Sequence, residues 1–131
     1  NHTTLDFNWI KSLLVSEQKQ YKERFSIKIG QQLKIVTTQE IECFYSENKG
    51  TYIHTTENRN YLIDCTIEQL ESELNPKEFF RVSRMFIVAL KAIKEIQVYS
   101  NSRLKIILNT YKEDEIIVSR ERVADFKNWI G

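Results

Sequence analysis

The sequence predicts a mainly β domain of the α+β class, built from antiparallel sheets of about eight to ten short strands with a few short helices. Between residues 25 and 118, apolar and polar residues alternate in short runs, as they do on strands with one buried face. Clusters of Gly, Asn, Asp and Ser separate these runs at hairpin spacing. With 131 residues, 41% of them hydrophobic, the chain is long enough for one core but short for two.

The first 24 residues differ from the rest and predict a connector helix. Their apolar residues recur at helical spacings and form one stripe: Trp9, Ile10, Leu13 and Leu14. This helix could pack on its own domain, or it could connect to an upstream domain or contact a second copy, and both interpretations stay open. Because the chain begins at Asn1 without an initiator Met, we expect an excised piece of a longer protein.

The compact domain is expected to span residues 25–131 and to begin with a series of strands. Turn residues at 30–32, 47–50 and 57–60 separate these strands from one another. The strands expected in this half are residues 25–29, 33–36, 41–46, 51–55 and 61–64.

A short helix is expected after these strands. Thr66 followed by Gln69 is a capping-box pattern, and the apolar residues that follow share one helical face. The helix should stop at Asn75, because Pro76 disfavours the helical backbone for the residue before it. Residues 77–80 then predict a tight connection.

The second half of the domain is expected to return to strands and to end in a helix. The pattern of residues 83–88 fits either one helical turn or a strand. Strands are expected at residues 93–99, 103–108 and 115–118. Ser119 can cap the final helix, in which Val123, Phe126 and Ile130 form the apolar stripe.

Four arginines are the most informative polar residues. Arg81 and Arg84 lie in a stretch whose aromatic and aliphatic residues must be core for most of its length, so their charges need an anionic partner. Arg120 and Arg122 stand at the expected start of the last helix, where unpaired backbone N–H groups and a free Ser119 hydroxyl favour an anion. Arginine can bind a phosphate, or the N7/O6 edge of guanine, with both arms.

The overall charge neither supports nor excludes a nucleic-acid partner. The formal net charge is +1, so a basic surface would have to come from local segregation of Lys and Arg. Alternatively, Arg81 could pair with a carboxylate such as Glu78 or Glu121, and Arg120 could cover an edge of the core. That alternative is as good for any single arginine and weaker for the set of four.

Residues for catalysis or metal binding are not grouped in the sequence, so we expect no enzyme, no cofactor and no metal site. His54 has no partner in sequence, and three glycines provide no phosphate-binding loop. Cys43 and Cys65 lack a CxxC spacing, which indicates free thiols in a reducing compartment. No signal peptide or apolar run of about 18 residues is present, so the expected location is the cytoplasm, away from the membrane.

Four blocks in one order resemble the LytTR family, the DNA-binding output domain of many bacterial response regulators. The central block is residues 79–96, and the flanking blocks are residues 41–49, 64–74 and 116–123. The resemblance implies sequence-specific binding of double-stranded promoter DNA by the output domain of a two-component transcription regulator. It also implies paired direct repeats as sites, two protomers on DNA, and a sensor kinase that acts through a missing N-terminal receiver joined by residues 1–24.

The resemblance also implies which residues contact DNA, since loops rather than one long helix enter the grooves in this family. The positions that match are Lys49, Thr51, Tyr52, Ser83, Arg84, Ser119, Arg120 and Arg122. Arg81 belongs to the same motif but follows two core aromatics, which favours a structural role. The sequence departs from the family at Ala89 and at Glu121, and an acid at position 121 is a poor phosphate contact.

A second hypothesis is a protein-interaction or small-ligand module without DNA contact. In that case Trp9, Tyr45 and Tyr52 would form a hydrophobic contact surface, and the near-neutral net charge is compatible with it. A hydrolase that uses His54 is a third and weaker hypothesis.

Overall fold

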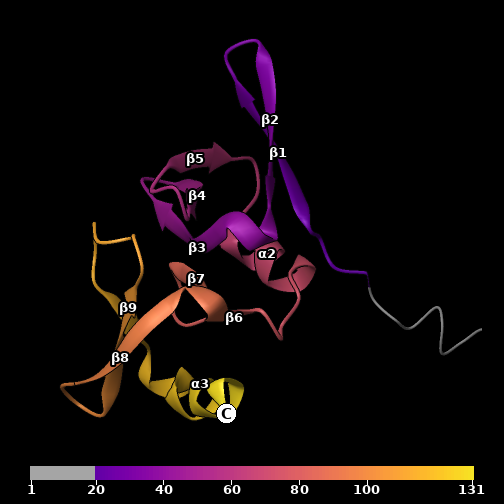
Figure 1. The fold of residues 1–131 in the computed structure, drawn as a ribbon. Helices are drawn as coiled ribbons and strands as arrows, with labels where there is room; N and C mark the ends of the chain where they lie inside the picture. The colour runs from indigo at the N-terminus through magenta and orange to yellow at the C-terminus, as the bar shows by residue number, and fades with distance from the viewer. Residues whose placement is uncertain (1–19) are drawn as a thin grey trace, which may run out of the picture.

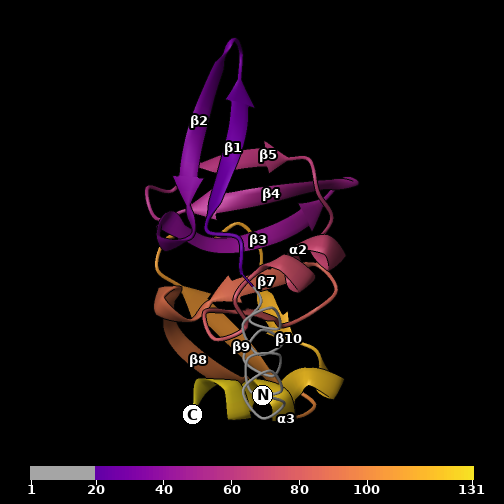
Figure 2. The same ribbon diagram turned by 90° about the vertical axis from the view of Figure 1, so that its right-hand side faces the viewer.

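The computed structural model describes residues 20–131, which form ten strands in three antiparallel sheets. A two-stranded hairpin, a five-stranded sheet and a three-stranded sheet follow one another along the molecule, and the C-terminal helix lies at the end opposite the hairpin (Figure 1, Figure 2). The predicted mainly β, antiparallel fold is confirmed. The helix predicted for the first 24 residues falls, up to residue 19, outside the described residues.

The hairpin consists of β1 (Arg24–Ile29) and β2 (Gln32–Thr37). Its turn contains Gly30 at φ +61, a left-handed backbone that glycine adopts without strain. Phe25 pairs with Val36, and both are buried at the base of the hairpin against the rest of the domain. The hairpin therefore shares the core at its base and projects away from it at its tip.

The five-stranded sheet has the order β5-β4-β3-β7-β6. Its strands are β3 (Ile41–Glu47), β4 (Gly50–Thr55), β5 (Asn60–Ile63), β6 (Phe79–Arg81) and β7 (Phe86–Ala89). The connection expected at residues 77–80 is therefore wrong at its end, because Phe79 and Phe80 pair with β7. The ambiguous run 83–88 resolves into a bend followed by a strand.

Helix α2 (Ile67–Glu73) lies between β5 and β6 and starts as predicted. Thr66 accepts a hydrogen bond from the backbone N–H of Gln69, and the Gln69 side chain accepts one from the backbone N–H of Thr66. The buried residues Ile67 and Leu70 form its inner face.

The three-stranded sheet has the order β10-β9-β8, from β8 (Ile93–Tyr99), β9 (Arg103–Leu108) and β10 (Ile116–Val118). A 3-10 turn at Arg120–Arg122 and helix α3 (Val123–Ile130) follow. Ser119 precedes this turn, but its side chain caps no helix, so the predicted cap is wrong. Among the described residues, no helix is long and apolar enough to cross a membrane.

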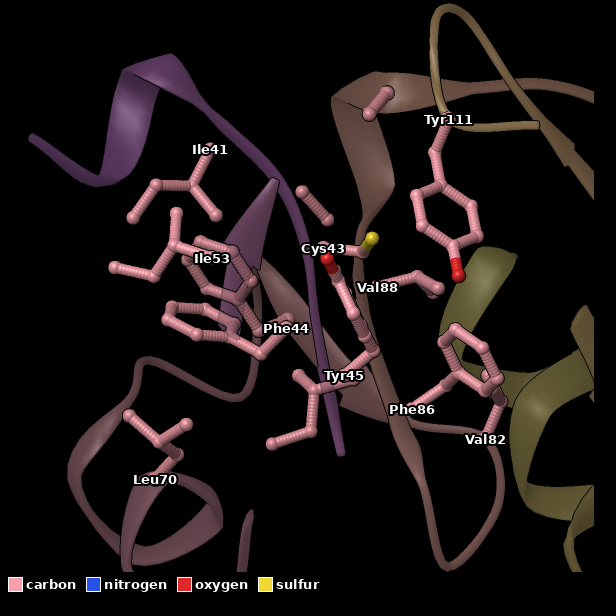
Figure 3. Packing of buried hydrophobic residues seen from close by; sticks show 14 of the residues in the cluster. Ile41, Cys43, Phe44, Tyr45, Ile53, Leu70, Val82, Phe86, Val88 and Tyr111 are labelled. Atoms are coloured by element: carbon pink, nitrogen blue, oxygen red, sulfur yellow. The ribbon is translucent and has the colours of Figure 1, made fainter. Parts of the chain in front are cut away.

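Strand β3 is the centre of the core because both of its faces are covered. Figure 3 shows Phe44 on the side of Ile53 and Leu70, and Tyr45 on the side of Phe86 and Tyr111. The Tyr45 and Tyr111 ring centroids lie 5.3 Å apart, within the range of favourable aromatic contacts. The Tyr45 face of β3 thus packs against the loop that connects β9 and β10.

Two buried polar side chains fasten that loop to the five-stranded sheet. The carboxylate of Glu42 is 1% exposed and accepts hydrogen bonds from the backbone N–H groups of Thr110, at 3.0 and 3.1 Å, and Tyr111, at 3.2 Å. His54 is equally buried and lies 2.8 Å from both Asn60 Oδ1 and Thr110 Oγ1. Both residues therefore join one sheet to the next.

The stability of the domain is expected to fall at alkaline pH. Burial raises the pKa of the Tyr45 and Tyr111 phenols and of the Cys43 thiol above their ordinary values of 10.0 and 9.0. The folded state holds these protons more tightly than the unfolded chain. Their contribution is therefore complete below about pH 9 and is lost as the pH rises further.

Urea unfolding between pH 7 and 11 measures this loss. Tyr111→Phe keeps the ring that packs on Tyr45 and His54 but removes one of the titrating groups. Its unfolding free energy should therefore fall less steeply above pH 10 than that of the parent. Equal slopes for parent and variant would contradict the assignment.

Candidate nucleic-acid interface

Three loops that are distant in sequence meet along one side of the domain. The backbone N–H of Ser46, at the end of β3, donates to the carbonyl of Met85 at 2.9 Å, which joins the β3–β4 turn to the β6–β7 loop. The backbone N–H of Ser119 donates to the carbonyl of Val82 at 2.9 Å, which joins the β6–β7 loop to the segment after β10. Figure 2 shows the β3–β4 turn and the start of α3 on the same side of the molecule. We call these three loops, residues 47–50, 82–85 and 119–122, the rim.

Arg84 and Arg120 are the exposed arginines of the rim. Both side chains lie at the surface, and neither makes a hydrogen bond or an ion pair with any residue of the described part of the chain. An exposed guanidinium without an internal acceptor keeps its five donors for an external anion. These two side chains are therefore available to an external anion, and their contact with DNA stays a prediction.

Arg81 and Arg122 instead bind other residues of the protein. The Arg81 side chain is 9% exposed and forms ion pairs with Glu68 at 3.3 Å and Glu71 at 3.2 Å. Arg122 donates to the carbonyl of Arg81 at 3.2 Å, and its guanidinium lies 3.7 Å from Glu71. The structural role predicted for Arg81 is thus confirmed by its contacts, although its partners are not Glu78 or Glu121. The prediction that Arg122 is a free cation is wrong.

The two serines of the rim serve the backbone. Ser83 Oγ accepts a hydrogen bond from the N–H of Met85 at 3.3 Å, which closes the β6–β7 loop. Ser119 Oγ donates to the carbonyl of Val82 at 3.3 Å, beside the backbone bond between the same residues. The prediction of a free, outward Ser119 hydroxyl is therefore wrong, because this hydroxyl donates to the backbone carbonyl of Val82.

The β3–β4 turn exposes Lys49, whereas the predicted site residues Thr51 and Tyr52, which follow the turn, are less exposed. Asn48 and Lys49 both have positive φ, 49 and 67, as a two-residue hairpin turn with the twist of its strands requires. Lys49 is exposed at the tip. Thr51 is only 7% exposed, so its side chain is withdrawn from the surface, and Tyr52 is half-buried and stacked on Tyr45 at 5.3 Å.

Two residues that the other hypotheses need, Tyr45 and His54, are buried in this arrangement. Tyr45 is buried and donates its hydroxyl to Asn60 Oδ1 at 2.8 Å, so it offers no contact surface, and Trp9 lies outside the described residues. His54, the candidate base of a hydrolase, is buried between Asn60 and Thr110. Within residues 20–131, no cluster of three or more His, Cys, Asp or Glu could hold a metal ion.

Comparison with known proteins decides the family. The model of the LytTr DNA-binding domain matches residues 31–131. The chain belongs to the LytTR family of DNA-binding domains. A solved LytTr DNA-binding domain from Bacillus cereus superimposes with a TM-score of 0.74 and covers 84% of this chain and 98% of its own, at 21% identity. That likeness shows that the fold is the LytTr fold.

Two relatives of this LytTR domain are named transcriptional regulators. It is 29% identical over 126 residues, 96% of the chain, to the transcriptional regulatory protein LytR of Staphylococcus aureus strain bovine RF122 / ET3-1. It is 30% identical over 108 residues, 81% of the chain, to the transcriptional regulatory protein YpdB of Escherichia coli K12. The match covers 50% of the first relative and 43% of the second, so the LytTR chain spans about half the length of these proteins.

Two acids of α2 that the sequence did not single out bind Arg81, which immediately precedes residues 82–85 of the rim of this LytTR domain. Glu68 and Glu71 look from sequence like the solvated face of α2, yet both reach Arg81. The pKa of Glu68 lies below its usual value, chiefly because of a hydrogen bond to its own backbone N–H and further because Arg81 lies beside it. Their spacing of three residues on one helix face is the only signal that could have paired them with a common cation.

Proposed function

We propose that this domain binds double-stranded DNA in a sequence-specific manner through the rim. Arg84 and Arg120 carry the proposal, because they are exposed on adjoining loops and make no hydrogen bond or ion pair within residues 20–131. Lys49 extends the same cationic edge at the β3–β4 turn. Guanidinium groups supply both phosphate contacts, which give affinity, and guanine contacts, which give sequence choice.

The proposed contacts come in two kinds. Lys49, Arg84 and Arg120 contact DNA with their side chains. Ser83 and Ser119 hydrogen-bond to the loop backbone and Tyr52 stacks on Tyr45, so any contact from them comes through the backbone or the edge of the side chain. Thr51, which is buried, and Arg122, which binds the Arg81 carbonyl and Glu71, support the loops.

Binding to DNA is expected to weaken steeply as salt rises. Each neutralised phosphate contributes about 0.9 to the slope of log affinity against log salt, so three cations give a slope of about −2.7 for each protomer. Gel-shift and fluorescence-anisotropy titrations of genomic fragments, between low and moderate salt, measure this slope. A domain that retains no fragment at any salt concentration would contradict the proposal.

We further propose that the chain is the output half of a bacterial response regulator in the cytoplasm. The relatives named transcriptional regulators are about twice as long as this chain, which supports an additional domain in the whole protein. On this proposal residues 1–24 connect the domain to a receiver that a sensor kinase phosphorylates, and two protomers occupy paired direct repeats. Footprinting of promoter DNA would show two protected segments, each reached by one rim.

A further inference from the structure

The carboxylate of Glu71, on the outer face of α2, lies between two guanidinium groups. One of its oxygens is 3.2 Å from Arg81, and the other is 3.7 Å from Arg122. Arg81 immediately precedes one rim loop, residues 82–85. Arg122 is the last residue of another, residues 119–122. A single side chain thus links both loops to the same helix.

The Arg81 side chain also hydrogen-bonds to the backbone of the β6–β7 loop. Its Nε donates to the carbonyl of Ser83 at 3.1 Å, and one terminal nitrogen donates to the carbonyl of Arg84 at 2.9 Å. The terminal nitrogen of Arg122 that faces Glu71 also donates to the carbonyl of Arg81. The position of the Arg84 backbone, and hence the reach of its exposed guanidinium, therefore depends on how Arg81 is held.

We propose that Glu71 is a positioning residue for DNA binding, which holds the Arg84 and Arg120 loops at a fixed separation through Arg81 and Arg122. The inference rests on the proposed function. Two neighbouring guanidinium groups repel each other, and a carboxylate between them removes that repulsion and fixes both. Glu68 assists from the other side of Arg81, where it is more exposed.

This role makes a prediction opposite in sign to simple electrostatics. Removing a negative charge close to a DNA-binding surface should strengthen binding to a polyanion if charge alone matters. If Glu71 positions the loops, Glu71→Gln should weaken specific binding by about tenfold, the size of one lost base contact. Non-specific affinity should stay within about twofold of the parent, since the exposed cations remain.

Glu73→Gln is the matched control. Glu73 lies on the same exposed helix and carries the same charge, but its side chain contacts neither arginine among the described residues. Anisotropy titrations should compare parent, Glu71→Gln and Glu73→Gln on a selected fragment and on a scrambled duplex. The ratio of specific to non-specific affinity should fall for Glu71→Gln alone.

A cycle with Arg122→Ala tests the route of the effect. If Glu71 acts through Arg122, Glu71→Gln should cost less affinity in the Arg122→Ala background than in the parent. If the circular dichroism spectrum shows that Glu71→Gln is not folded, Glu68→Gln replaces it in the test. Because Glu68 is more exposed, Glu68→Gln should also weaken specific binding, but by less.

The outcomes separate the two proposals. A parent domain that does not bind DNA contradicts the proposed function. A parent that binds, with Glu71→Gln and Glu68→Gln binding as tightly as Glu73→Gln or more tightly, overturns the positioning role alone.

Discussion

Replacement of both Arg84 and Arg120 by alanine is expected to weaken specific DNA binding by roughly a hundredfold or more, because each arginine contact contributes about 1–3 kcal/mol. The thermal unfolding midpoint should hardly change. Neither side chain makes an internal hydrogen bond or ion pair with the described residues, so the folded state loses little when both are removed. Anisotropy titrations give the affinity, and differential scanning calorimetry gives the midpoint.

Arg59→Ala is the control for charge. Arg59 is an exposed arginine in the β4–β5 turn, at the end of β4 opposite to the β3–β4 turn. Its backbone N–H and carbonyl both bond to Thr55, whereas its guanidinium makes no hydrogen bond or ion pair with the described residues. Arg59→Ala should reduce specific affinity by less than about twofold, through long-range electrostatics only. A double variant of Arg84 and Arg120 that binds like Arg59→Ala would refute the rim as the binding surface.

The strands of this domain were predictable because their signals are local. Alternation with turn residues locates β1 to β5 and β8 to β10 to within a few residues. The capping box of Thr66 and Gln69 fixes the start of α2 independently of everything else in the chain. Each of these signals depends on neighbours within one hairpin or one helical turn, so it can be read without tertiary contacts.

Strand β6 and the hydrogen bonds of Ser119 were not predictable in the same way. Phe79 and Phe80 are extended because they pair with β7, which lies several residues further on. Ser119 has the composition of a helix cap, but the carbonyl of Val82, 37 residues earlier in sequence, takes both its hydroxyl and its backbone N–H. In both cases a tertiary partner overrides a local preference.

The division of the four arginines into two kinds also depends on tertiary structure. Sequence places Arg81 and Arg84 among core aromatics and Arg120 and Arg122 at the expected start of the last helix. It favours a structural role for Arg81, but it does not decide which of the others pair inside the protein. The structure gives Arg81 and Arg122 carboxylates from α2, whereas Arg84 and Arg120 remain exposed. A helix that reads as an ordinary solvated face thereby decides which arginines are free.

Replacement of Glu42 by alanine is expected to destabilise the domain by about 2–4 kcal/mol, because it leaves the buried N–H groups of Thr110 and Tyr111 without acceptors. These bonds join the five-stranded sheet to the loop between β9 and β10. Glu42→Gln retains the shape and one acceptor, so it should cost less, about 1–2 kcal/mol. Urea denaturation of parent and variants measures the differences.

Replacement of Glu42 should also change the relative positions of the rim loops, because these loops belong to the two sheets that Glu42 joins. The β3–β4 turn and the β6–β7 loop belong to the five-stranded sheet, whereas residues 119–122 follow β10 of the three-stranded sheet. Glu42→Gln should therefore weaken specific DNA binding even under conditions where it is fully folded. Glu57→Ala, which removes an exposed acid from the β4–β5 turn, should change stability by less than about 0.5 kcal/mol. If Glu42→Ala is no more destabilising than Glu57→Ala, the carboxylate does not hold the sheets together, and the rim must be aligned by other contacts, among them those of Tyr45, Phe86 and Tyr111.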